Sequence, residues 1–311
     1  MKGLRYTILF ICSALLTHAC ETTEKIDEFP LRPSKLVLNC FFTADSTWEF
    51  QVSNSLSVLD NAQIELIDSA SITLLKDGAQ VDTLTSPEAD GIYRSGKILP
   101  GVNTTYAVTA TAPGFDEVLY AEDYVPVSVP FNQLSGTIID SSFYQSHDYR
   151  TDRPEIRGNI EGTIELQFKD PPGENNFYHL TLYFIEYNLV DYKDTVFHPF
   201  RYPVNFTIQD AAAEETSFGS GALFSDQYFD GQEHTVKLTY HTYGIKRYMQ
   251  TFFAELTSLT ESAYLYKSSI EDYQAASGDP FSEPVLVYGN IENGLGIFAG
   301  YATTTDSLVI F

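Results

Sequence analysis

Short runs of alternating apolar and polar residues recur about every ten residues through the first part of this chain. Leu36–Phe42, Thr104–Thr111 and Val118–Tyr124 are typical, and turns such as Pro100-Gly101 separate them. Because a period of two places alternate side chains on one face of a strand, the pattern favours packed β-sheets over helices. It predicts an immunoglobulin-like β-sandwich over residues 35–126. This prediction concerns the architecture alone, because the sequence lacks the Cys…Trp…Cys core of antibody domains.

A second β-rich domain is predicted over residues 131–311. It follows the connector Val125–Pro130, which two prolines make stiff and extended. Gly162–Lys169 and Phe177–Tyr187 predict a hairpin around the turn cluster Asp170–Asn176. The expected fold class is therefore mainly β.

Two segments of this second domain depart from the strand pattern. The polar, charged stretch His147–Pro154 predicts a long loop. Ser258-Leu259-Thr260-Glu261 has the form of a capping box, and apolar residues then recur at helical spacing. We expect one helix near residues 260–275, ended by Ser277-Gly278-Asp279-Pro280.

Residues 1–19 have the form of a lipoprotein signal peptide. Basic residues precede the apolar stretch Tyr6–Leu16, which is too short to span a bilayer as a helix. Small Ala19 then precedes Cys20. This arrangement resembles the lipobox of bacterial lipoproteins, in which the signal is cut before a cysteine whose thiol carries diacylglycerol. We predict lipidation of Cys20; the alternative is an ordinary signal peptide with an incidental cysteine.

Residues 20–34 are predicted to form an acidic tether, because Pro30 and Pro33 break any helix there. An acidic stretch after the lipidated cysteine resembles the signal that sends lipoproteins to the cell surface in Bacteroidetes-type bacteria. A solvated spacer is the alternative. We therefore expect a lipid-anchored protein of the outer membrane, exposed at the cell surface or, alternatively, on the periplasmic face.

The chain is strongly acidic, with 18 Lys+Arg against 42 Asp+Glu and a net charge of −24. Nucleic acids and anionic membrane surfaces attract basic proteins, so this balance disfavours both as direct partners. The expected contact with the membrane is the N-terminal lipid alone.

Cysteine usage excludes an internal disulfide from the mature chain. Cys12 lies in the predicted signal peptide and Cys20 would carry lipid, so Cys40 alone is left. Its strand-like surroundings predict a buried, inert thiol.

The sequence shows no constellation typical of catalysis. No histidine pair has zinc-protease spacing, and no Gly-x-Ser-x-Gly elbow or phosphate-binding glycine loop is present. Asp226–Glu233 carries oxygen ligands near a glycine but does not fit the EF-hand register, so calcium there is only an alternative. We expect no cofactor, no metal site and no enzymatic activity.

Several stretches resemble one family, the outer-membrane lipoproteins of Bacteroidetes-type bacteria grouped as domain of unknown function 4249. They include Phe168–Tyr178, Asp279–Pro284 and Asn290–Phe298. The resemblance implies a lipid-anchored envelope protein, frequently encoded beside TonB-dependent outer-membrane transporters, and it assigns no reaction. The resulting hypothesis is a non-enzymatic accessory protein that binds a ligand or docks on such a transporter. A surface structural or adhesive module is the alternative.

Overall fold

The computed structural model describes residues 33–56, 63–148, 153–189, 197–210, 213–215, 221–246, 249, 251–277 and 282–310. The chain is mainly β, as predicted, with one helix in this described part. The elements are β1 (Leu36–Phe42), β2 (Trp48–Asn54), β3 (Ser71–Lys76), β4 (Ala79–Leu84), β5 (Ile92–Ser95), β6 (Thr105–Thr111), β7 (Leu119–Tyr124), β8 (Phe131–Asp148), β9 (Arg153–Lys169), β10 (Phe177–Leu189), β11 (Phe197–Pro203), β12 (Asn205–Ile208), β13 (Ala213–Glu215), β14 (Gly221–Ser225), β15 (Glu233–Ile245), β16 (Thr251–Leu259), α2 (Glu261–Ala276) and β17 (Leu295–Val309).

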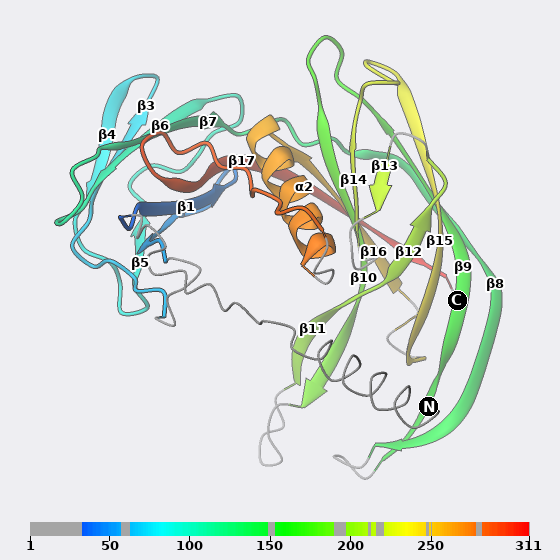
Figure 1. Cartoon of the computed structure of the whole chain (residues 1–311). Coiled ribbons are helices and arrows are strands. Elements are labelled where there is room, and N and C mark those ends of the chain that lie inside the picture. Colours follow the sequence, from blue (N-terminus) through cyan, green and yellow to red (C-terminus); the bar gives the residue numbers. More distant parts are fainter. Residues whose placement is uncertain are drawn as a thin grey trace, which may run out of the picture.

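One long sheet runs through both halves of the molecule. It is nine-stranded, in the order β13-β14-β10-β16-β17-β1-β2-β5, with β11 added beside β10. Two four-stranded sheets, β4-β3-β6-β7 and β12-β15-β9-β8, complete the fold. In Figure 1, β17 crosses from the left-hand group of strands to the right-hand group, so the two sandwiches share this strand.

The first half of β17 belongs to the N-terminal sandwich. Val37 to Phe42 of β1 pair in parallel with Leu295 to Gly300. The second half of β17 pairs antiparallel with β16, from Tyr301 opposite Leu259 to Val309 opposite Thr251. The sequence predicted the sandwich over residues 35–126 but not this strand from the far end of the chain.

The N-terminal sandwich is closed by an aromatic core that β17 completes. Phe298 is fully buried, with its ring centroid 4.6 Å from that of Phe42 and 6.2 Å from that of Trp48. Trp48 is also fully buried, and its Nε1 donates to Ile98 O at 2.8 Å. Cys40 lies in the same core at 2% exposure, and burial raises the pKa of its thiol, as expected for an inert cysteine.

Helix α2 covers the opposite face of the shared sheet. Ala263 is fully buried against Ile297 and Ala299 of β17. Along β17, Ile297 and Ala299 therefore face the helix, while Phe298 faces the N-terminal core, as strand alternation requires. Figure 1 shows the helix in front of β17, between the two groups of strands.

The helix begins two residues later than the proposed capping box implies. Its N-cap is Thr260, whose side chain accepts a hydrogen bond from Ala263 N. Ser258, the cap residue of the predicted box, instead lies in β16 with its hydroxyl buried. Pairing with β10 and β17 keeps Ser258 in the strand, so that part of the prediction was wrong.

The bounds of the predicted loop His147–Pro154 were too wide, and its middle, residues 149–152, lies outside the described residues. β8 continues to Asp148 and β9 begins at Arg153, so β9 starts well before the stretch Gly162–Lys169 from which the sequence predicts it. Backbone pairing sustains the polar end of β8, because its side chains Ser141, Gln145 and His147 are exposed and add little to the core.

Asp123 of β7 ties the two halves together. Its Oδ2 accepts hydrogen bonds from Thr260 Oγ1 at 2.7 Å and from Gly300 N at 3.3 Å, and its Oδ1 accepts one from Tyr124 N at 2.9 Å. One carboxyl group therefore joins the N-terminal sandwich, the helix N-cap and the middle of β17. Burial raises the pKa of Asp123 to about 6, although these hydrogen bonds act in the opposite direction.

Replacing Phe298 by alanine is expected to lower the free energy of unfolding by about 3–5 kcal/mol, because it leaves a cavity among stacked rings. Since β17 is shared, urea unfolding followed by fluorescence and circular dichroism should remain one transition that shifts as a whole. Phe200→Ala is the control, because Phe200 is 53% exposed and its loss should cost less than about 1 kcal/mol. Destabilisation of the N-terminal sandwich alone would contradict the role assigned to β17.

Asp123 predicts a specific pH dependence. Its folded-state pKa lies above the unfolded value, so its contribution to stability is complete below about pH 4 and is lost as the pH rises through about 6. The loss amounts to about 3 kcal/mol at most. The free energy of unfolding in urea, measured near pH 4 and near pH 7, should differ less between these conditions in Asp123→Asn than in the native chain. An identical difference in both proteins would contradict this role.

Candidate functional site

Two loops meet at the end of the second sandwich that faces the N-terminal half. One joins β9 to β10 and begins at Asp170; the other joins β14 to β15 and begins at Asp226. Asp170, Asp226 and Asp230 place one carboxylate oxygen each within 4.8 Å of one another. The sequence singled out both loops separately, as a turn cluster and as an oxygen-rich segment, but did not place them together.

Each carboxylate accepts hydrogen bonds from the opposite loop or from a neighbouring strand. Asp170 Oδ1 accepts from Tyr178 OH at 2.5 Å and its Oδ2 accepts from Gly231 N at 2.8 Å. Asp226 Oδ2 accepts from Asn176 N at 3.0 Å and from Asn176 Nδ2 at 3.1 Å. These contacts hold the two loops against each other.

The third carboxylate is more open to solvent. Asp230 is exposed, and its Oδ1 accepts from Gly173 N at 2.8 Å. Gly173 and Gly231 both have positive φ, so glycine allows the two turns to aim these N–H groups across the gap. The two loops therefore cross-link each other in both directions.

The three carboxylates of the cluster lie close enough to repel one another when they are charged. Asp170 is 1% exposed, and burial, followed by the charges of Asp226 and Asp230, raises the pKa of its carboxyl group. Burial and the neighbouring Asp170 carboxylate also raise the pKa of Tyr178, so this phenol stays protonated and donates. Three carboxylate oxygens this close also form the kind of ligand set that Ca²⁺ prefers. Hydrogen bonds from N–H and O–H groups already occupy several of these acceptor oxygens. The carboxylates therefore hold the two loops together through hydrogen bonds alone.

An open cleft of about 650 Å³ lies beside the cluster. Its lining is mostly polar, and Phe177 at one side stacks on Tyr264 of α2 with ring centroids 4.7 Å apart. The lining residues are Gly173, Glu174, Asn175, Phe177, Ser225, Asp226, Gln227 and Asp230. The cleft thus opens close to the start of the helix and to the junction of the two sandwiches.

Two of the described histidines have structural roles. His234 Nε2 lies 2.6 Å from Asp210 Oδ2, and its ring stacks on Phe229 at 3.8 Å between centroids. His179 lies under α2, where burial and then the charge of Lys267 lower its pKa to about 4. This imidazole is therefore neutral at physiological pH.

The predicted lipidation site, Cys20, lies outside the described residues, as does the signal peptide at 1–19. Only the last residues of the tether predicted at 20–34 are described. Among the described helices, none combines the length and the apolar character needed to cross a membrane.

Asp170→Ala is expected to lower the free energy of unfolding by about 2–4 kcal/mol, because it leaves the Tyr178 hydroxyl and the Gly231 N–H without their acceptor. Asp230→Ala, the matched change at the exposed carboxylate, should cost about 1 kcal/mol or less. Urea unfolding of both variants checks this order. Equal losses would show that the buried carboxylate is no more important to the loops than the exposed one.

Comparison with solved structures finds β-rich surface proteins at very low similarity. Collagen adhesin (CNA) from S. aureus aligns over 89% of this chain and 95% of its own, at 8% identity and a TM-score of 0.20. The collagen binding domain of Erysipelothrix rhusiopathiae surface protein RspB aligns over 87% and 96%, at 8% identity and a TM-score of 0.16. Superpositions this poor carry no argument about function.

No curated protein matches the chain. The family comparison is decisive by contrast, because a single family model matches residues 21–307. It confirms the domain family that the sequence motifs indicated. The chain belongs to the family described as domain of unknown function DUF4249.

Proposed function

We propose that this chain is a lipid-anchored accessory protein of the outer membrane that holds a ligand or a partner protein without transforming it. One observation carries the proposal: the family match begins at residue 21, directly after Cys20. A leader that is removed before a lipidated cysteine would leave this boundary, because the family domain then begins next to the anchor.

The direction in which the chain enters the fold supports an anchored arm. The tether leads into Leu36, and β1 then runs parallel to β17, with Val37 opposite Leu295. Past Gly300, β17 continues for another nine residues to Val309, a rise of about 30 Å. An anchor at the Leu36 end would therefore hold the N-terminal sandwich near the membrane and carry the second sandwich outward.

The candidate site supports holding rather than catalysis. Asp170 and Asp226 are buried and accept hydrogen bonds from Tyr178 and from loop N–H groups. A general acid or base must reach a substrate proton, and these oxygens are directed at the protein's own donors. A cleft with such walls suits a bound ligand or a docked partner.

The charge of the mature chain supports the same placement. Removal of residues 1–19 takes away two basic residues and leaves 16 Lys+Arg against 42 Asp+Glu. An anionic leaflet repels such a domain, so the lipid and the tether, and not a basic surface, would hold it at the membrane.

Cys20→Ala tests the anchor. The variant should fold normally but leave the membrane fraction, because the acyl chains would provide the attachment and the two described cores consist of residues that follow Pro33. Membrane fractionation in high salt and mass spectrometry of the mature N-terminus measure this. Cys40→Ala is the control, since it removes the buried thiol and should leave attachment unchanged. A Cys20→Ala chain that stays with the membrane would contradict the proposal.

The partner is tested by extraction of the native protein in mild detergent. Co-purification of a TonB-dependent transporter in fixed ratio would support docking, and recovery as a lone monomer would count against it. A deletion strain with normal nutrient uptake but altered attachment would instead favour a surface structural or adhesive module.

A further inference from the structure

The open cleft of about 650 Å³ beside the acidic cluster has walls that carry one sign of charge. In the described part of the chain, eight residues line it, and three of them are the carboxylates Glu174, Asp226 and Asp230. The other five are two amides, one hydroxyl, one phenyl ring and one glycine, so none of the eight is basic. A cleft of this size can enclose a small organic molecule or a short stretch of peptide.

Each of these carboxylates keeps an oxygen that no described residue uses. Asp230 accepts one hydrogen bond at Oδ1, from Gly173 N. Asp226 accepts two at Oδ2, both from Asn176. Of Glu174, only the backbone oxygen accepts a hydrogen bond from a described residue. Oδ2 of Asp230, Oδ1 of Asp226 and the whole carboxylate of Glu174 are therefore left for a ligand.

The free oxygen of Asp226 is the feature that points most directly to a ligand. Asp226 is 3% exposed, so its carboxylate is almost removed from bulk water. In the part of the chain that the structure describes, the fully buried side-chain atoms without a hydrogen-bond partner are the hydroxyls of Tyr240 and Ser258 alone. Asp226 Oδ1 therefore reaches open space, and the space that Asp226 lines is the cleft. A charged donor in the cleft would satisfy this oxygen best.

Further carboxylates strengthen the negative potential around the cleft. Burial first, and then neighbouring charges that include those of Glu174 and Glu261, raise the pKa of Tyr124 on β7. Glu261 belongs to the first turn of α2. The negative charge of the two loops therefore continues to the start of the helix and to the junction with the N-terminal sandwich. A cation bound there would reduce this repulsion.

Two lysines lie on elements that border this region, but neither lines the cleft. Lys267 of α2 is buried enough to lower its pKa, and the charges of Glu271 and Glu255 act on it in the opposite direction. Lys169, the last residue of β9, is exposed, and its pairing partner on β15 is Glu233. Carboxylates outside the cleft thus accompany both lysines.

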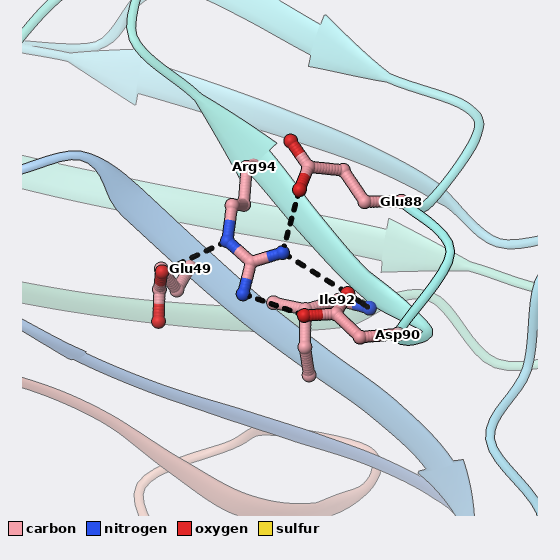
Figure 2. Close-up of polar contacts among 5 residues, drawn as sticks. All are labelled: Glu49, Glu88, Asp90, Ile92 and Arg94. Carbon is pink, nitrogen blue, oxygen red and sulfur yellow. Dashed lines mark hydrogen bonds and ion pairs between the residues drawn. The ribbon is translucent and has the colours of Figure 1, made fainter. Parts of the chain in front are cut away.

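On the N-terminal sandwich, the chain itself supplies a cation where carboxylates gather. Arg94 makes ion pairs of 2.8 Å with three carboxylates, those of Glu49, Glu88 and Asp90. Figure 2 shows its guanidinium between these side chains, with contacts to all three. The cleft also brings three carboxylates together, but no basic residue is among those that line it. The corresponding place is left for a cation from outside the chain.

Phe177 adds an apolar wall that favours an organic cation over a metal ion. Its ring stacks on that of Tyr264, with centroids 4.7 Å apart, so its orientation is fixed. A carbon chain can pack on this ring, and an ammonium group is attracted to its π-system. Ca²⁺ gains nothing from a ring and requires about six to eight oxygens. Both oxygens of Asp170, the third member of the acidic cluster, already accept hydrogen bonds.

We propose that this cleft binds an organic cation, a protonated amine on a carbon chain, through Glu174, Asp226 and Asp230, with Phe177 against the chain. This inference rests on the proposed function, because it names the chemical class of what the protein holds. The amine has two sources, a free small molecule and a lysine side chain of a partner protein. Anionic ligands such as nucleotides are repelled by the same walls.

The first probe is cadaverine, a linear diamine, titrated calorimetrically into the whole chain in detergent at neutral pH. It should bind at a single site. Pentanediol, which has hydroxyl groups in place of both ammonium groups, should bind at least about tenfold more weakly, because the hydrogen bonds to charged groups are lost. A blocked peptide with one lysine between glycines probes the second source. Binding of cadaverine alone identifies a free amine, and binding of the peptide alone identifies a partner's side chain; either supports the proposal.

Glu174→Gln/Asp230→Asn removes two charges from the walls of the cleft at exposed positions, so the fold should persist. The affinity for the amine that binds should fall by at least about tenfold. Asp116→Asn/Glu117→Gln is the matched control, because it makes the same two changes on the exposed turn between β6 and β7. It should change the affinity by less than about twofold, since salt screens distant charges.

Failure of both amines to bind would overturn the proposal. Equal binding of pentanediol, or equal losses in the two double variants, would overturn it as well, because attraction to an acidic chain in general would then explain the result. Binding of Ca²⁺ without binding of either amine, lost in the cleft variant, would make a metal ion the occupant and contradict the proposal. None of these results depends on lipidation of Cys20, so the ligand and the anchor can fail separately.

Discussion

The parallel pairing of β1 with β17 is the contact on which the rest of the structure depends. It joins the first strand of the fold to the last, and it inserts Phe298 into the N-terminal core beside Phe42 and Trp48. The same strand continues into the second sandwich through β16. Neither sandwich is therefore a separate segment of chain, and the N-terminal one cannot complete its sheet until the C-terminal residues arrive. Such non-local pairing is costly in chain entropy, so we expect folding to be slow.

The contacts between parts of the chain that are distant in sequence also explain where polar groups are buried. At the junction, Asp123 offers acceptors to Thr260 and to Gly300 N, so a carboxyl group satisfies donors that three separate elements bring together. At the inner end of the second sandwich, Asp170 and Asp226 do the same for two loops. In both places a charged group is kept out of water because it satisfies backbone donors, at the cost of a raised pKa for Asp123 and Asp170.

Local patterns in the sequence predict the elements well, and long-range pairing accounts for what they miss. Alternation at Leu36–Phe42 and Thr104–Thr111 identifies strands that the structure contains as β1 and β6, and the helix lies where its spacing predicts. Nothing local indicates that Leu295 pairs with Val37, because a parallel partner leaves no mark on either strand. The prediction misses the polar end of β8 for a related reason. This end is held by pairing with β9 and not by burial of its own side chains. The sequence identifies the two turns that carry the acidic cluster, but only the fold brings these turns together.

The sheet edges of the N-terminal sandwich are protected from pairing with other strands. Covered edges gather on the N-terminal sandwich, where Arg94 and its carboxylates surround β5 and Glu292 pairs with β7. β8 lies on the second sandwich, which the path of β17 carries away from the Leu36 end of β1. Ion pairs at β5 and a paired segment at β7 thus limit the addition of further strands to the sandwich that contains the first strand of the fold.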